Sequence, residues 1–258
     1  MAQAGELDEL RRQLGLSLRG TRSSIMEEFA ARMSEAQARG VPPEEFFATV
    51  GEQQLRAYLD AFDRAVRLEE QSGERFYDWR DLYHLGLLTA GVQRDSAKAL
   101  RYFDAALAEH DDAAVRVARA GAFATLGSFD RALTDLDHVI ASHGPQEAMA
   151  ARQQRAQVYL ALERWSDAVD DLRTLAAAEG TRPQPAVELA HALVRLGQAA
   201  EAREVLRRTL MRWPEERPAL YLRATLAMQR EEWPIARQDW TALIGLDPER
   251  PEPYIGRG

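Results

Sequence analysis

The stretch PQPAVELAHALVRLGQAAEAREVLRRTLMRWPEERPALYLRATLAMQREEWPIARQDWTALIGLDP, residues 183–248, contains two copies of one pattern. Ala202 and Ala236 stand 34 residues apart, and Ala168 lies 34 residues before Ala202. Mostly apolar residues follow each alanine at the fourth, seventh and eighth places, as in a helix that buries one face. A second set of alanines lies twelve residues before these three: Ala156, Ala190 and Ala224. The spacing predicts pairs of helices with small residues where the helices touch.

A helix-turn-helix unit of 34 residues resembles the tetratricopeptide repeat. Units 183–216 and 217–250 have the small residues expected at positions 8 and 20, and they carry Pro214 and Pro248 at position 32. Unit 149–182 has Gly180 where this proline is expected, and unit 113–148 is two residues longer. The matches are individually loose, but together they are specific to this family.

The first unit is the least regular. The segment from Leu82 to Gly86 and the helix around Ala99 fit the pattern, but the loop Gly91–Asp95 resembles that of the related Sel-like repeats. Five units then cover about 75–250, and the resemblance implies an all-α, right-handed α-solenoid of helix-turn-helix repeats. We expect the turns within the units at Gly91–Asp95, Gly127–Ser128, Glu163–Arg164, Gly197–Gln198 and Glu231–Glu232.

The segments outside the array lack the alanine spacing. Residues 1–74 are amphipathic, with a stripe at Leu55, Leu59, Phe62 and Val66, and we expect an N-terminal helical cap on the first repeat. The alternatives are a homodimer formed through this stripe, or folding of the segment back into the groove of the array. Residues 251–258 match the start of a sixth repeat, so we expect either a piece of a longer protein or a natural end with a frayed tail.

The composition excludes several classes of protein. The chain has no cysteine, which removes disulfides, thiolate metal sites and cysteine nucleophiles. A net charge of −8 disfavours nucleic acid as a partner. The first twenty residues contain no continuous apolar run of the kind that a secretory signal needs, and no later stretch resembles a membrane span. We therefore expect a cytoplasmic protein that does not bind nucleic acid or membranes. Lys98 is the only lysine among 33 basic residues, which indicates a GC-rich, bacterial-like coding sequence.

We predict no catalytic, metal or cofactor site, and hence no enzyme. The five histidines are scattered, and neither a phosphate-binding glycine loop nor a nucleophile elbow is present. Three aspartates, Asp135, Asp171 and Asp239, share position 23, and this recurrence indicates a solvated outer face rather than one active site. Four arginines on one helix could bind an anionic partner, although solvation is the simpler interpretation: Arg203, Arg207, Arg208 and Arg212.

The resemblance also implies a ligand groove. In this family positions 2, 5, 9, 12 and 13 of the first helices line a concave groove that takes extended or helical peptides. The corresponding residues here are Val117, Gly121, Ala124, Gln153, Gln157, Leu160, Val187, His191, Val194, Arg195, Tyr221, Thr225 and Met228. The lysine and asparagine that bind chaperone C-terminal carboxylates in some members are absent. The small, apolar and amide residues instead favour an apolar or helical segment.

These observations predict a non-catalytic interaction scaffold or adaptor that binds a protein segment in the groove. One alternative is a structural assembly subunit that dimerises through residues 1–74. Another is the targeting arm of a longer enzyme or regulator that continues beyond Gly258. The groove could also be a by-product of the curvature of the array.

Overall fold

The computed structural model describes residues 78–178 and 182–247, and all the secondary structure in this part of the chain is helical. It forms two compact units, divided between Ser128 and Phe129. The all-α fold class expected from the repeat is therefore confirmed. The predictions for residues 1–74 and 251–258, the cap and dimerisation segment and the start of a sixth repeat, lie outside the described residues.

The described part of the first unit consists of three helices: α5 (Trp79–Gly91), α6 (Ser96–Glu109) and α7 (Ala113–Thr125). Aspartates begin all three, because the carboxylates of Asp78, Asp95 and Asp112 accept hydrogen bonds from backbone N–H groups of the first turns. Phe103 on α6 is fully buried between α5 and α7 side chains, together with Leu85 and Val115.

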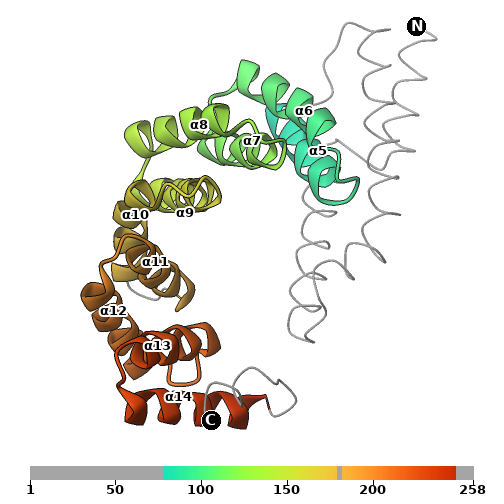
Figure 1. Ribbon diagram of the computed structural model, residues 1–258. Coiled ribbons are helices and arrows are strands. Elements are labelled where there is room, and N and C mark those ends of the chain that lie inside the picture. Colours follow the sequence, from blue (N-terminus) through green and yellow to red (C-terminus); the bar gives the residue numbers. More distant parts are fainter. Residues whose placement is uncertain (1–77, 179–181, 248–258) are drawn as a thin grey trace, which may run out of the picture. The chain divides into compact units, whose positions relative to one another are not determined.

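The second unit contains seven helices in its described part: α8 (Phe129–Ser142), α9 (Pro145–Ala161), α10 (Trp165–Ala177), α11 (Gln184–Arg195), α12 (Ala199–Arg212), α13 (Arg217–Gln229) and α14 (Trp233–Leu246). Within this unit, each helix from α8 to α13 packs against the next one along the chain, and α11 also contacts α13 (Figure 1). Stacked pairs of this kind leave each repeat in contact with its neighbours only.

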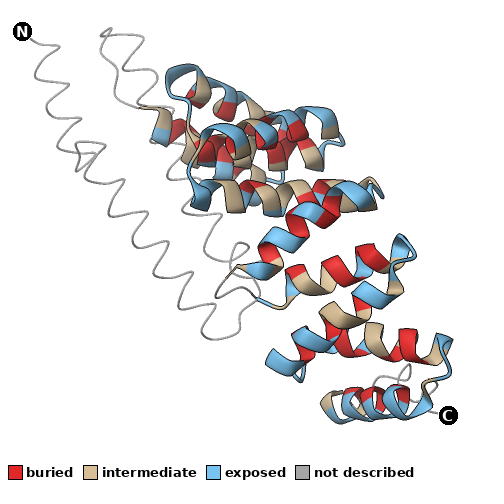
Figure 2. Ribbon diagram, turned by 90° about the vertical axis from the view of Figure 1, so that its left-hand side faces the viewer, coloured by how far each residue is buried: buried red, intermediate tan, exposed pale blue. Residues whose placement is uncertain are grey.

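The alanines that define the repeat lie at the helix contacts. Ala156, Ala168, Ala190, Ala202 and Ala224 are fully buried, and Ala236 is nearly so. They belong to one continuous core of the second unit, with Leu172, Leu193, Leu206 and Trp240. Figure 2 shows buried positions in red along the helix sides that face neighbouring helices, with exposed positions in pale blue on the opposite sides. Small side chains let the helices approach closely, as the spacing predicted.

The turns lie where they were predicted, and four of them share one conformation. Gly127, Glu163, Gly197 and Glu231 each have positive φ, between 56° and 74°. The N–H of the residue after each one donates to the carbonyl five residues back along the chain in a short bond, such as Gln198 to Leu193 at 2.8 Å. This is the Schellman arrangement that ends a helix with a left-handed residue. Glycine adopts that conformation without strain, whereas glutamate does not.

We therefore expect Glu231→Gly to stabilise the chain by about 0.5–1 kcal/mol. The change introduces glycine, which the equivalent turns already have at Gly127 and Gly197. The reciprocal change, Gly197→Ala, should destabilise the chain by about 1 kcal/mol. Urea denaturation of the two variants measures both effects. Equal stability of Glu231→Gly and the unchanged chain would show that this turn is not strained.

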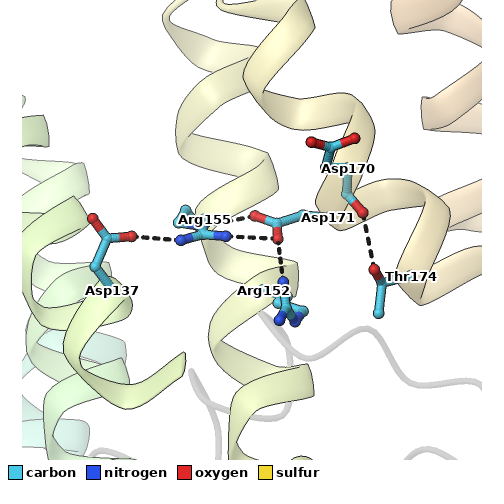
Figure 3. Close-up of polar contacts among 6 residues, drawn as sticks. All are labelled: Asp137, Arg152, Arg155, Asp170, Asp171 and Thr174. Carbon is cyan, nitrogen blue, oxygen red and sulfur yellow. Dashed lines mark hydrogen bonds and ion pairs between the residues drawn. The ribbon is translucent and has the colours of Figure 1, made fainter. Parts of the chain in front are cut away.

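The aspartates at position 23 of the repeat contradict one prediction. Asp135, Asp171 and Asp239 were expected on a solvated outer face, but all three are buried, with at most 3% of their surface exposed. The carboxylate of Asp171 accepts hydrogen bonds from Arg152 on α9 at 3.0 Å and from Arg155 Nε at 2.7 Å (Figure 3). Asp239 is bound in the same way by Arg223 Nε and Nη2, at 2.8 and 2.6 Å. A buried carboxylate requires such partners.

Candidate functional site

The first helices of three successive repeats line a hollow of about 960 Å³ in the second unit. Leu160 comes from α9, Val187 and His191 from α11, and Tyr221 and Thr225 from α13. All five were predicted groove residues, and the structure brings them together because positions 5, 9 and 12 lie on one side of each helix. The other lining residues are Glu188, Arg217, Pro218, Leu222, Leu243 and Asp247.

Tyr221 contributes a large, exposed aromatic side chain to this hollow, with 51% of its surface accessible. Its ring meets the ring of Trp240 edge to face, with centroids 5.3 Å apart. The Thr225 hydroxyl donates to the Tyr221 carbonyl at 2.9 Å, so its hydrogen is not available to a ligand. A large apolar face held by a buried tryptophan is suited to contact another protein, because little side-chain entropy remains to be lost.

The polar groups of the hollow are few and held in place. Glu188 accepts hydrogen bonds from the side-chain amides of Gln157 at 2.8 Å and Gln184 at 2.9 Å. Arg217 donates to the Leu246 carbonyl at 2.6 Å and lies 3.5 Å from the Asp247 carboxylate. Two carboxylates and one guanidinium leave the rim slightly acidic. Among the described residues, no group of three or more histidine, aspartate or glutamate side chains could hold a metal ion.

The remaining predicted residues do not line this hollow. Gln157 lies beside it through its bond to Glu188, and Gln153 is exposed elsewhere on α9. Val194 and Met228 pack partly into the core, with Met228 Sδ accepting from Trp240 Nε1 at 3.3 Å. The Arg195 guanidinium stacks on the Trp165 ring, 4.6 Å from its centroid. The three α7 residues, Val117, Gly121 and Ala124, belong to the first unit.

The sequence interpretation missed six lining residues. Pro218 occupies position 2 of the same helical stripe, and Glu188 and Leu222 lie one residue beyond predicted positions, so the stripe itself could have indicated them. Leu243 and Asp247 come from the second helix of the last repeat and the residue that follows it, outside the stripe considered. Arg217 is the first residue of α13 and connects it to the end of α14.

Antiparallel helix pairs with buried alanines at a period of 34 residues define a helical-repeat protein. The model of the tetratricopeptide repeat family matches residues 88–148 and 187–251. These two segments are tetratricopeptide repeats. No curated protein matches the sequence.

Several solved structures share the fold. One is YrrB, described as a tetratricopeptide repeat protein with an unusual peptide-binding site, with 15% identity and a TM-score of 0.59 over 74% of this chain and 96% of YrrB. A repeat protein from Parabacteroides merdae has 16% identity and a TM-score of 0.58 over 91% of this chain and 84% of its own. MamA from Desulfovibrio magneticus RS-1 has 19% identity and a TM-score of 0.59, covering 68% and 98%.

In the described part of the chain, no helix combines the length and the hydropathy that crossing a membrane requires.

Proposed function

We propose that the chain is a non-catalytic interaction scaffold that binds a protein segment in the hollow lined by α9, α11, α13 and α14. The observation that carries this proposal is the convergence of Leu160, Val187, His191, Tyr221 and Thr225 on one largely apolar hollow. Tetratricopeptide repeats are protein-interaction modules, and YrrB, which shares the fold, is described as having a peptide-binding site.

The chemistry of the hollow favours a segment with one or two large apolar side chains. Leu160, Val187, Pro218, Tyr221 and Leu222 offer an apolar surface large enough for such anchors. Glu188 and Asp247 add negative charge that only Arg217 offsets. A lysine, arginine or amide donor next to the anchor would therefore complement the rim.

Val187→Glu and Tyr221→Ala are each expected to weaken binding of such segments at least tenfold, since one adds a charge to the apolar surface and the other removes its largest face. The probes are peptides selected from a displayed random 12-residue library on the unchanged protein. Fluorescence anisotropy then gives the Kd for each variant. Selected sequences should share an apolar anchor with a basic or amide neighbour.

Met211→Glu is the matched control, because Met211 is an apolar side chain, 72% exposed on α12, and lies outside the hollow. It should bind the selected peptides with unchanged Kd. Peptides that bind Val187→Glu and Tyr221→Ala as tightly as the unchanged protein would overturn the proposal. So would a loss of affinity that follows a matching loss of thermal stability.

A further inference from the structure

A second, smaller pocket of about 290 Å³ lies between α12, α13 and α14, and it shares no lining residue with the hollow. Three arginines from two helices line it: Arg203 and Arg207 from α12, and Arg223 from α13. The rest of the lining is Ala227, Glu232, Ile235 and Gln238. Three guanidinium groups therefore line one small pocket of a chain whose net charge is −8.

Other repeats of the same chain show what normally stands opposite such an arginine. Arg119 and Arg155 each come one residue before the first-helix alanine, as Arg223 does. Arg119 donates to Asp104 on the preceding α6 at 2.8 Å, and Arg155 donates to Asp137 on the preceding α8 (Figure 3). Both aspartates lie five residues after the second-helix alanine of the preceding repeat.

The equivalent position before Arg223 is Arg207, five residues after Ala202. An arginine therefore stands where two other junctions place the carboxylate that binds the first-helix arginine. Arg223 keeps its partner within its own repeat, Asp239, just as Arg155 keeps Asp171. What Arg223 lacks is the second carboxylate, the one that the preceding repeat supplies to Arg119 and Arg155.

The local charge is positive as a result. Five arginines, Arg203, Arg207, Arg208, Arg223 and Arg230, surround three carboxylates, those of Glu204, Glu232 and Asp239, which leaves a net charge of +2. Arg207 and Arg208 hold the pKa of Glu204 at about 2, and Arg230 and Arg203 lower the pKa of Glu232. Both carboxylates are therefore ionised at neutral pH, so the excess of two positive charges already includes them.

Two guanidinium donors in the pocket lack good acceptors. Arg203 Nε is buried and has no hydrogen-bond partner among the described residues. Arg207 Nη1 donates only to the thioether of Met211, at 3.1 Å, although its other nitrogens bind Glu204. Sulfur is a weak acceptor, and guanidinium groups bind oxyanions through paired N–H donors.

We propose that this pocket binds an external oxyanion group, a carboxylate or a phosphate, which takes the place that Asp104 and Asp137 fill at the other junctions. The anion would accept hydrogen bonds from Arg203, Arg207 and Arg223 and balance the excess positive charge. Ala227 and Ile235 give one side of the pocket an apolar surface, which suits a carbon group next to the anion.

The test uses inorganic phosphate and acetate as probes with the whole chain at pH 7. At a phosphate concentration about ten times its Kd, the thermal unfolding midpoint should rise by about 3 °C relative to chloride at equal ionic strength. A larger shift with phosphate than with acetate identifies a phosphoryl group as the better ligand, and a larger shift with acetate identifies a carboxylate. Either result supports the pocket.

Arg207→Gln should abolish the anion-specific shift, and Arg207→Asp should abolish it as well by supplying the missing carboxylate from within the chain. Arg207→Asp should unfold at a midpoint at least as high as that of the unchanged chain without phosphate. Arg173→Gln is the matched control. Arg173 occupies the same repeat position on α10 as Arg207 does on α12, but the next repeat has Leu189 at the position of Arg223. Its anion response should equal that of the unchanged chain.

No anion-specific shift in the unchanged chain would overturn the proposal. The same conclusion would follow if all three variants responded equally, since the anion would then act on the surface in general.

Discussion

Replacing Arg223 by leucine is expected to destabilise the chain by about 3–5 kcal/mol, because it leaves the Asp239 carboxylate buried without its partner. Asp239 is 1% exposed, and both of its oxygens accept hydrogen bonds from Arg223. The cost comes from the unpaired buried charge and exceeds the strength of the pair itself. Asp239→Val should cost less, because the Arg223 side chain is 24% exposed and can turn its charge toward water.

Another repeat of the chain indicates a second substitution that should recover the lost stability. In the repeat before, Leu189 and Val205 occupy the positions of Arg223 and Asp239, and Leu189 is part of the core. Arg223→Leu combined with Asp239→Val should therefore recover most of the stability, to within about 1–2 kcal/mol of the unchanged chain. Urea denaturation of the two single variants and the double variant measures the coupling. Additive single effects would show that the pair is not the source of the cost.

Arg155→Leu provides an internal comparison for the same pair in another repeat. Asp171 would retain Arg152 Nη1 at 3.0 Å after the change, so its carboxylate would not be left without a cation. The loss should therefore be smaller than for Arg223→Leu. A loss as large as that of Arg223→Leu would mean that the second arginine does not compensate.

The buried aspartates also show where prediction from the sequence ended. The repeat spacing predicted the helices, their turns and five residues of the hollow, because those features depend on the side of a helix on which a residue lies. Burial of Asp171 and Asp239 depends instead on which charge the neighbouring helix brings opposite. An arginine sixteen residues upstream of each aspartate, and the Leu189 and Val205 replacement, were visible in the sequence and could have indicated the pairing.

The pocket at Arg207 was beyond prediction for a related reason. The sequence indicated an arginine-rich helix, for which solvation was the simpler interpretation. Its departure from the other junctions becomes visible only when the structure pairs Arg119 with Asp104 and Arg155 with Asp137. Helical periodicity assigns a residue to a side of its own helix, whereas these contacts join different repeats.

Gly86→Ala is expected to destabilise the first unit by about 2–3 kcal/mol, although alanine is the better helix former. A Cβ atom at Gly86 would lie 2.3 Å from Phe103 Cε1, 2.6 Å from Cδ1 and 2.8 Å from Cζ. The Phe103 ring is fully buried between α5 and α7, so it has little freedom to move away. The overlap therefore outweighs the gain in helix propensity of about 1 kcal/mol.

Gly91→Ala is the control on the same helix, because a Cβ there would meet no atom within 4 Å. It should change stability by no more than about 0.5 kcal/mol.

A second variant tests the cause directly: Phe103→Leu removes ring atoms that the new methyl group would overlap. If overlap is the cause, Gly86→Ala should cost much less in the Phe103→Leu background than alone. Urea denaturation and amide hydrogen exchange in α5 and α6 provide the measurements. An equal cost of Gly86→Ala in both backgrounds would assign the loss to the backbone of α5 instead of to its contact with Phe103.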